Sequence, residues 1–340
     1  MERILNIIIS IVFTLITLST NARANTISQC DNDYIPEGVR KIVNEEAREP
    51  RYSQIEQRLD TYLKAKSARI GVAVIINGTD TISVNGRQEF PMLSVYKFPQ
   101  ALAVADYCTN HNMSLNDTIR VSAAEMKPDT WSPMRDKYGR KDMALPLSEI
   151  LAYSVMQSDN NACDVLFRLI GGPQVADSLM KKLGYDEIHI QSTEAEMHND
   201  PNLCHANRAT PLQMAALFDR FYRQAMRHDS PILEAVGAMM MQCVTGNNRL
   251  PLPLMPTNAE IGHKTGTGDV NSQGRIIAVN DAGYVFLPNK QGYAIAVFIA
   301  DSGYGMADTE KIIADISEIV LFSCSVFESQ NCTYGSQNCK

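Results

Sequence analysis

The sequence lacks the short-range patterns that usually hold metals or nucleic acids. Its eight cysteines include no Cys-x-x-Cys pair, and its six histidines include no His-x-His or His-x-x-x-His pair. Because zinc sites are commonly built from such pairs, no metal is expected. The net charge is −7 and no dense basic run occurs, which disfavours a nucleic-acid partner. We therefore expect neither a metal or other cofactor nor a nucleic-acid partner.

Long apolar runs are scarce as well. The run from Ile4 to Leu18 has about 15 residues, fewer than the ~20 that a membrane-spanning helix needs. Arg3 precedes this run, and the small-x-small pattern Ala22-Arg23-Ala24 follows it. This order is typical of a secretory signal peptide. We predict a signal peptide over residues 1–24 that is cut after Ala24, a periplasmic mature protein and no stable membrane partner.

The remaining sequence is long enough for one large domain or two interleaved ones. A helix is expected near 53–66, followed by a β-hairpin with strands 70–76 and 81–84 around the turn Asn77-Gly78. Further strands are expected at 261–267, 275–287 and 292–300, with a closing helix at 307–322. Between them, from about 92 to 243, the pattern is mostly helical, with helices expected at 97–107, 146–155, 162–170, 173–183 and 211–226.

This order of elements indicates an α/β layer built from both chain ends. We expect residues 25–88 and 245–324 to form it, with 89–244 as an inserted helical domain. The end of the chain repeats Ser-Gln-Asn-Cys at 329–332 and 336–339 and offers little to bury. We therefore expect 325–340 to be a polar tail, either flexible or tethered by a disulfide.

Three short strings carry the chemistry: Ser94-Val95-Tyr96-Lys97, Ser158-Asp159-Asn160 and Lys264-Thr265-Gly266. Average composition predicts roughly one Ser-x-x-Lys by chance in such a chain, but only about 0.1 copies of either of the other two strings. A second Ser-x-x-Lys, Ser178 to Lys181, runs into Lys182-Leu183-Gly184, which is typical of the last turn of a helix. Order and partners therefore favour Ser94.

These residue types suit acyl transfer. Ser94 precedes a helix, so its hydroxyl would face the positive end of the helix dipole, and Lys97 lies one turn further on nearly the same face. An amine there can take the serine proton. Ser158 can pass a proton to a departing nitrogen, and Asn160 can hold a substrate carbonyl. A plain helix N-cap also explains Ser-Asp-Asn, and Lys264 alone also fits a solvated strand end.

Together the three strings resemble those of the class A serine β-lactamases, and the likeness covers nearly the whole mature chain. It implies an antiparallel five-stranded sheet flanked by helices plus an inserted all-helical domain. The sequence gives no sign of the oligomeric state, and we take a monomer as the default. It also implies that Trp131 lies at the pocket rim and that Glu194 is the deacylating base on a loop. Glu196, two residues on, is the rival for that role.

The likeness is imperfect around that loop. His198 stands where a water-binding asparagine is usual, Asp164 replaces another asparagine, and Asn207 replaces an aspartate that often closes the loop by a salt bridge. These changes resemble the cephalosporinase branch, which includes extended-spectrum enzymes. Cys163 follows Asn160 by three residues and either faces the pocket or is a small buried residue.

The resemblance also implies a cation for the substrate carboxylate. Arg249 matches the version in which this arginine comes from the segment Thr245 to Arg249. Arg275 is the competitor, but relatives carry that arginine at the position of Gly274, and a one-residue offset turns a strand side chain to the other face. We therefore prefer Arg249, alongside Thr265, Gly266 and Thr267 as substrate-binding residues.

The reaction implied is the opening of penicillins and cephalosporins through an acyl-enzyme on Ser94. Lys97 and Glu194, through a water, are alternative bases for acylation. Ser158 would protonate the nitrogen, and the backbone N–H groups of Ser94 and Thr267 would form the oxyanion hole. The alternatives are a penicillin-binding D,D-peptidase, which Glu194 argues against, and a β-lactam sensor that stays acylated.

All eight cysteines follow the expected cut, in a compartment that permits disulfides. Their pairing cannot be deduced from the sequence. The family's pairing of first and last helices implies, as a hypothesis, a bridge from Cys30 to a C-terminal cysteine.

Overall fold

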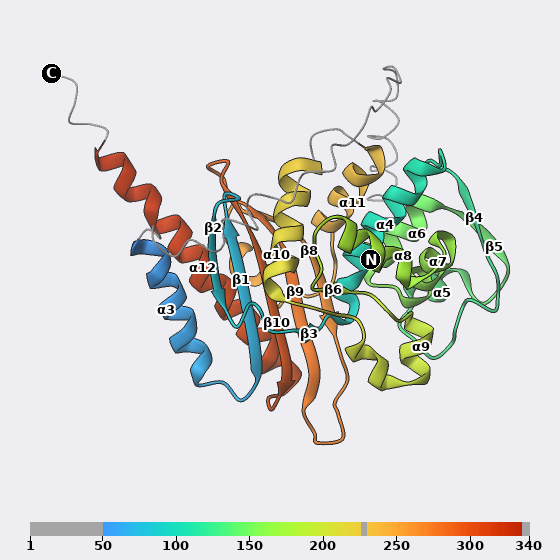
Figure 1. Ribbon diagram of the computed structural model, residues 1–340, viewed down its shortest axis with the longest axis horizontal. Coiled ribbons are helices and arrows are strands. Elements are labelled where there is room, and N and C mark those ends of the chain that lie inside the picture. The colour runs from blue at the N-terminus through green and yellow to red at the C-terminus, as the bar shows by residue number, and fades with distance from the viewer. Residues whose placement is uncertain (1–49, 226–229, 335–340) are drawn as a thin grey trace, which may run out of the picture. The chain divides into compact units, whose positions relative to one another are not determined.

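The computed structural model describes residues 50–225 and 230–334 (Figure 1). A five-stranded antiparallel sheet lies at its centre, in the order β2-β1-β10-β9-β8. The strands are β1 (Arg69–Ile76), β2 (Asp80–Val84), β8 (Glu260–Thr267), β9 (Ile276–Phe286) and β10 (Gly292–Ser302). The sheet thus joins an N-terminal hairpin to three strands near the C-terminus, which confirms the fold predicted from the sequence.

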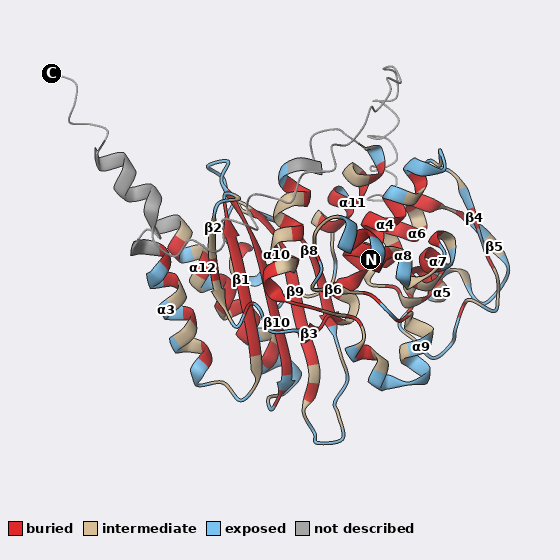
Figure 2. Cartoon of the chain, viewed as in Figure 1, coloured by how far each residue is buried: buried red, intermediate tan, exposed pale blue. Residues whose placement is uncertain are grey.

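Period-2 alternation along the strands gives the sheet two apolar faces. On β10, Tyr293, Ile295, Val297 and Ile299 face a core shared with α3 (Pro50–Lys64) and α12 (Met306–Tyr334). The intervening Ala294, Ala296 and Ala300 face the other core, with the inserted helices. Small side chains on this second face let α10 (Pro211–Arg220) lie against β1 and β10, and Figure 2 shows these strands buried along most of their length.

The segment between β2 and β8 is mostly helical, as predicted. It contains α4 (Lys97–Asn110), α5 (Pro133–Tyr138), α6 (Leu147–Gln157), α7 (Asn160–Ile170), α8 (Pro173–Lys182), α9 (Glu194–Asn199), α10 and α11 (Pro231–Met241). Five short strands in the same segment were not predicted: β3 (Phe90–Pro91), β4 (Thr118–Val121), β5 (Met143–Pro146), β6 (Ile188–His189) and β7 (Arg208–Ala209). Strands of two to four residues are too short to show a periodic pattern.

The closing helix is longer than predicted. Helix α12 continues to Tyr334 instead of ending at Phe322, because the sequence has neither glycine nor proline between Met306 and Tyr334. Residues 325–334, which we expected to belong to a polar tail, are therefore helical. The signal peptide, Cys30 and residues 335–340 lie outside the described residues, and the exact domain bounds stay a prediction. Among the described helices, none is both long and apolar enough to cross a bilayer.

Candidate active site

Ser94 lies on a turn that the sheet holds in place. Residues Leu93–Tyr96 form the 3-10 turn η2, which leads directly into α4. Leu93 has φ 47°, a left-handed conformation that is uncommon for a residue other than glycine. The buried Asn280 side chain of β9 donates to the carbonyls of Pro91 (2.8 Å) and Met92 (3.0 Å). The turn is thereby fastened to the sheet just before the predicted nucleophile.

Strand β8 lies directly beside this turn. It is an edge strand, so one of its sides has no neighbouring strand in the sheet. A Cβ on Gly266 would lie 2.4 Å from the Met92 carbonyl oxygen and 3.3 Å from the Ser94 nitrogen. Only glycine permits so close an approach. The strings Ser94 to Lys97 and Lys264 to Gly266, about 170 residues apart in the sequence, are therefore neighbours in the structure.

The Lys97 amine joins three of the predicted segments. Its side chain is fully buried, and its Nζ donates to the Ser158 carbonyl (2.8 Å) and to Asn160 Oδ1 (2.6 Å). The same Nζ lies 3.0 Å from Glu194 Oε1. Burial of a charge is tolerated where it is paired and hydrogen-bonded. Lys97, Ser158, Asn160 and Glu194 thus form one cluster.

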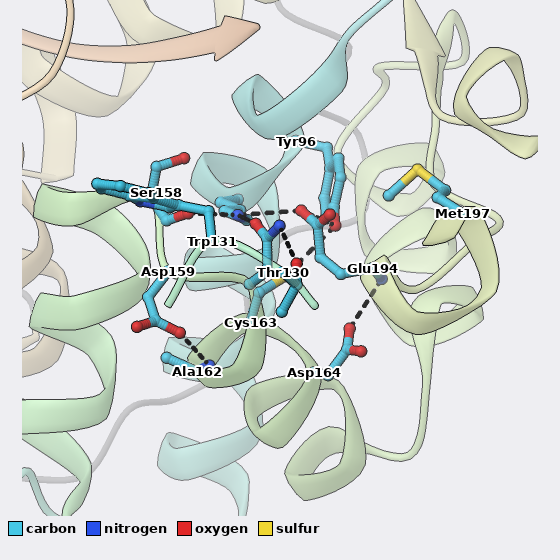
Figure 3. A network of polar contacts seen from close by, with 12 residues as sticks. Tyr96, Thr130, Trp131, Ser158, Asp159, Ala162, Cys163, Asp164, Glu194 and Met197 are labelled. Atoms are coloured by element: carbon cyan, nitrogen blue, oxygen red, sulfur yellow. Dashed lines mark hydrogen bonds and ion pairs between the residues drawn. The ribbon is translucent and has the colours of Figure 1, made fainter. Parts of the chain in front are cut away.

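Ser158 is not the N-cap of α7; it is the C-cap of α6. It adopts a left-handed conformation (φ 59°) after α6, and Asp159 caps α7 by accepting from the Ala162 amide (Figure 3). The capping explanation is therefore right for Asp159, and it leaves the Ser158 hydroxyl for another partner. That partner is Lys264, whose Nζ donates to Ser158 Oγ (2.9 Å). Burial, together with the charge of Lys97, lowers the pKa of Lys264 to about 7.

The structure separates the two rival glutamates. Glu196 is exposed and completes a capping box at the start of α9: its carboxylate accepts from the Thr193 amide (2.8 Å), and its own amide donates to the Thr193 hydroxyl. Glu194 instead points toward Lys97 and Tyr96. The local capping requirement therefore accounts for Glu196, whereas Glu194 lies in the cluster.

Tyr96 is a site residue that was missed. Its hydroxyl donates to Glu194 Oε1 (2.8 Å) and lies 3.4 Å from Cys163 Sγ, so Cys163 is both buried and close to the site. The Tyr96 ring is fully buried and stacks on Phe167. Burial raises the pKa of Tyr96 well above its usual value, so the hydroxyl stays a donor. The sequence offered one sign of this role: the hydroxyl of a buried tyrosine needs a hydrogen-bond partner.

Asp164 and Asn207, two of the residues that depart from the usual pattern around the Glu194 loop, hold that loop in place. Asp164 accepts from the backbone amides of Glu194 (2.8 Å) and Ala195 (2.9 Å). Burial and the charge of Glu194 raise the pKa of Asp164 to about 6. At the far end, the buried Asn207 accepts from the Gln191 and Ser192 amides and donates to the Ser192 carbonyl. Neutral hydrogen bonds of Asn207 therefore close this end of the loop.

A cavity of about 160 Å³ lies between this loop and α7. Glu194, Asn160, Asp164, Thr130 and His198 are among its lining residues. Trp131 follows Thr130 in the sequence and is 60% exposed. Its Nε1 donates to the Gln157 carbonyl. Within the described residues, no group of three or more His, Cys, Asp and Glu side chains could hold a metal ion.

Of the two candidate arginines, only Arg249 lies at the site. Its guanidinium donates to Thr267 Oγ1 (2.7 Å) and to the Gly266 carbonyl (3.1 Å). It is buried and paired with Glu310 (3.1 Å). Arg275 instead donates to the carbonyls of Ser67 and Asp301. Thr265 lies on β8 with Gly266 and Thr267, and its hydroxyl is hydrogen-bonded to the hydroxyl of Thr245 (2.6 Å).

Comparison with known proteins identifies the family of this chain. A model described as the beta-lactamase enzyme family matches residues 54–323. A beta-lactamase of Bacteroides uniformis is 36% identical over 273 residues, which cover 80% of this chain and 92% of that protein. The crystal structure of the TLA-1 extended-spectrum beta-lactamase is 38% identical with a TM-score of 0.77, covering 80% of this chain and 99% of that one. A class A beta-lactamase from Bacteroides cellulosilyticus is 36% identical with a TM-score of 0.77, covering 82% and 100%. The chain therefore belongs to the beta-lactamase enzyme family and is a class A member of it.

Proposed function

We propose that this β-lactamase opens the ring of penicillins and cephalosporins through a covalent acyl-enzyme on Ser94. The observation that carries the proposal is the position of the Lys97 amine, which lies within 3.0 Å of Glu194 and hydrogen-bonds Ser158 and Asn160. One buried amine in contact with a carboxylate and two polar residues, one turn after a serine, can move a proton to or from that serine.

Acylation begins with attack of Ser94 Oγ on the lactam carbonyl. The serine proton goes to Lys97, or to Glu194 through a water, and both remain candidates. The oxyanion is held by the backbone N–H groups of Ser94 and Thr267, a device whose single donors are worth about 3 kcal/mol. The close approach of β8 to the Ser94 turn at Gly266 supports this pair. Ser158 then protonates the leaving nitrogen and is re-protonated by Lys264, since the two share a 2.9 Å hydrogen bond.

Deacylation uses Glu194 as the base that activates water. Both Lys97 and Tyr96 contact Oε1 of this carboxylate, so we assign the water proton to Oε2. The cavity that Glu194 shares with Asn160 and His198 is large enough for the water. We propose that His198 lines the water's position and that Asp164 fixes it indirectly, by holding the backbone of Glu194.

The substrate's carboxylate is bound by the hydroxyls of Thr265 and Thr267, with Arg249 behind them. Four hydrogen bonds hold the Arg249 guanidinium, so it acts mainly by raising the local potential and orienting Thr267. Asn160 binds the substrate's amide carbonyl, and the exposed Trp131 borders the pocket. Because TLA-1 is named an extended-spectrum beta-lactamase, we propose that late cephalosporins are among the substrates.

Time-resolved intact mass of the 25–340 protein tests the function. The protein is mixed with a penicillin or a cephalosporin while loss of the lactam absorbance is followed. We expect rapid ring loss with an adduct that forms and then clears. An adduct that persists while ring loss stops would instead favour a D,D-peptidase or a sensor, and the absence of any adduct would refute the acyl-enzyme.

Tyr96→Phe is expected to slow deacylation about tenfold. The variant keeps the ring that stacks on Phe167 and removes only the hydroxyl that donates to Glu194. A hydrogen bond to a charged group contributes about 1.5 kcal/mol or more. Losing it removes a donor that orients the Glu194 carboxylate, so deacylation should slow while acylation keeps its rate, as single-turnover intact mass would show. Equal slowing of both steps would limit Tyr96 to a packing role.

We also propose that the chain is exported by a signal peptide cut after Ala24 and works in the periplasm as a monomer. The support is the apolar segment and the small-x-small pattern of the first 24 residues. The bounds 25–88 with 245–324 and 89–244 are proposed for its two domains.

A further inference from the structure

A second cluster of reactive side chains lies behind the substrate-binding strand. His263 on β8 and Asp281 on β9 are both buried, and His263 Nδ1 lies 2.8 Å from Asp281 Oδ1. Gly283, opposite His263 in the ladder, leaves room for the ring, because a Cβ there would come within 2.6 Å of the His263 Cβ. The ring is therefore held with its Nδ1 on the carboxylate and its other nitrogen turned away from Asp281.

Cys243, which follows α11, lies next to this histidine. Its Sγ is 3.3 Å from Thr245 Oγ1, and the imidazole of His263 is close enough to favour the thiolate. Cys243 is only partly buried, and none of residues 242–248 is fully buried, with Val244 53% exposed. The arrangement of thiol, imidazole and carboxylate is the one that activates a sulfur nucleophile, and it reaches the surface through this segment.

The charges around Cys243 favour the thiolate. Burial opposes ionisation of Cys243, but His263 and Lys264 of β8 outweigh it and lower its pKa to about 7. Burial likewise disfavours a charged His263, but Asp281 of β9 and Cys243 outweigh it and raise its pKa to about 10. Tyr222, the other titratable group beside Cys243, stays neutral because burial raises its pKa.

The three buried cysteines of the described residues, Cys108, Cys163 and Cys204, have the opposite environment. Burial raises the pKa of Cys108 to about 11 and also raises the pKa of Cys163 and Cys204. A thiol with a raised pKa reacts slowly, because the thiolate is the nucleophile. Cys243 is thus set apart from these three by its His263–Asp281 partner and by its exposure.

We propose that Cys243 is a modification site at which a small-molecule disulfide forms a mixed disulfide and stops β-lactam hydrolysis. The Cys243 sulfur attacks one sulfur of the disulfide, the new S–S bond forms as the old one breaks, and the departing thiolate takes a proton from water. Cys243 is oxidised and the disulfide is reduced to one thiol. The loss of activity, though not the modification itself, rests on the proposed function.

The contacts of Cys243 explain why an adduct would inhibit. Its sulfur touches Thr245, whose hydroxyl lies 2.6 Å from the hydroxyl of Thr265. An added group must displace Thr245, so Thr265 loses its partner in the substrate-binding strand.

Alkylation by iodoacetamide between pH 6 and pH 9, read peptide by peptide by mass, tests the site. We expect the Cys243 rate to rise to half its maximum near pH 7. At pH 7 it should exceed the rate of Cys204 at least tenfold, since an ordinary thiol of pKa ~8.5 is only a few per cent ionised there. A Cys243 rate that keeps rising above pH 8.5, or labelling only after unfolding, would overturn the proposal.

Dithiobis-nitrobenzoate then tests the inhibition. Activity should fall in step with modification of Cys243 and return with a thiol reductant, whereas Cys243→Ser should keep activity within about threefold and ignore the reagent. Cys204→Ser is the matched control and should be inhibited like the wild type. His263→Asn should move the alkylation midpoint toward the value of a free thiol; if it does not fold, the wild-type profile still decides.

These readings separate the two proposals. Labelling of Cys243 is measured by mass, so it tests the modification site even if no β-lactam is hydrolysed. An absence of hydrolysis would count against the proposed function and not against the modification site. Full modification of Cys243 in an enzyme that stays active would refute only the inhibition.

Discussion

Glu194→Gln is expected to stop the enzyme as a covalent adduct on Ser94. Glutamine keeps the size of the side chain and an oxygen for Tyr96 and Lys97, which both contact Oε1, but it cannot take a proton from water. General bases typically contribute ~10²–10⁴-fold in rate, so turnover should fall about a thousandfold while acylation continues. Intact mass after mixing with a cephalosporin should show nearly complete acylation that decays over minutes to hours.

Glu196→Gln is the matched control, two residues away on the same short helix. Its carboxylate accepts from the Thr193 amide at the start of α9, and glutamine keeps an oxygen that can do the same. We expect thermal stability close to that of the wild type and turnover within threefold of it. Steady-state turnover of Glu194→Gln equal to the wild type, or an equal loss in Glu196→Gln, would contradict the assignment of the base.

Ser94→Ala is expected to abolish covalent chemistry altogether. Removing a nucleophile that works as a unit with its base typically costs ~10⁴-fold or more in kcat. The alanine leaves the η2 turn and its attachment by Asn280 intact, so the fold and non-covalent binding of the substrate should remain. Intact mass should show no adduct at any time, and ligand-induced thermal stabilisation should persist.

The second Ser-x-x-Lys of the chain provides the control. Ser178 lies within α8 (Pro173–Lys182) and is exposed to solvent, and Ser178→Ala should retain full activity. An adduct in Ser94→Ala, or loss of activity in Ser178→Ala, would move the nucleophile away from Ser94.

The strands of the main sheet were predictable because each carries a strong local pattern. The Asn77-Gly78 turn lies between the apolar strand β1 and the alternating strand β2. Both turn residues adopt positive φ, 51° and 75°, as a tight hairpin requires. Helix α4 was predictable despite Pro99, which lies in its first turn, where proline's missing N–H is tolerated. The short strands β3 to β7 could not be predicted, because their pairing depends on distant residues and not on local periodicity.

The choice between rival residues depended on the fold. Both Glu194 and Glu196 suit a base, and only the capping box of α9 shows that Glu196 is already engaged. Tyr96 was visible inside its motif, but its contact with Glu194 joins residues 98 positions apart. The Cys243–His263–Asp281 cluster likewise joins three segments, and no spacing between them marks it in the sequence.

By itself the sequence determined the kind of chemistry, because three ordered strings with a serine, lysines and an amide are rare enough to identify an acyl-transfer enzyme. It also determined the main strands and helices, because hydrophobic periodicity is a local property of the sequence. The tertiary structure alone decided which side chains meet: that Lys97 contacts Glu194, that Arg249 and not Arg275 lies beside Thr267, and that a histidine and a carboxylate accompany Cys243. Hydrogen bonds and ion pairs depend on a few ångströms between atoms of distant segments, and that separation is set by how the helices pack on the sheet.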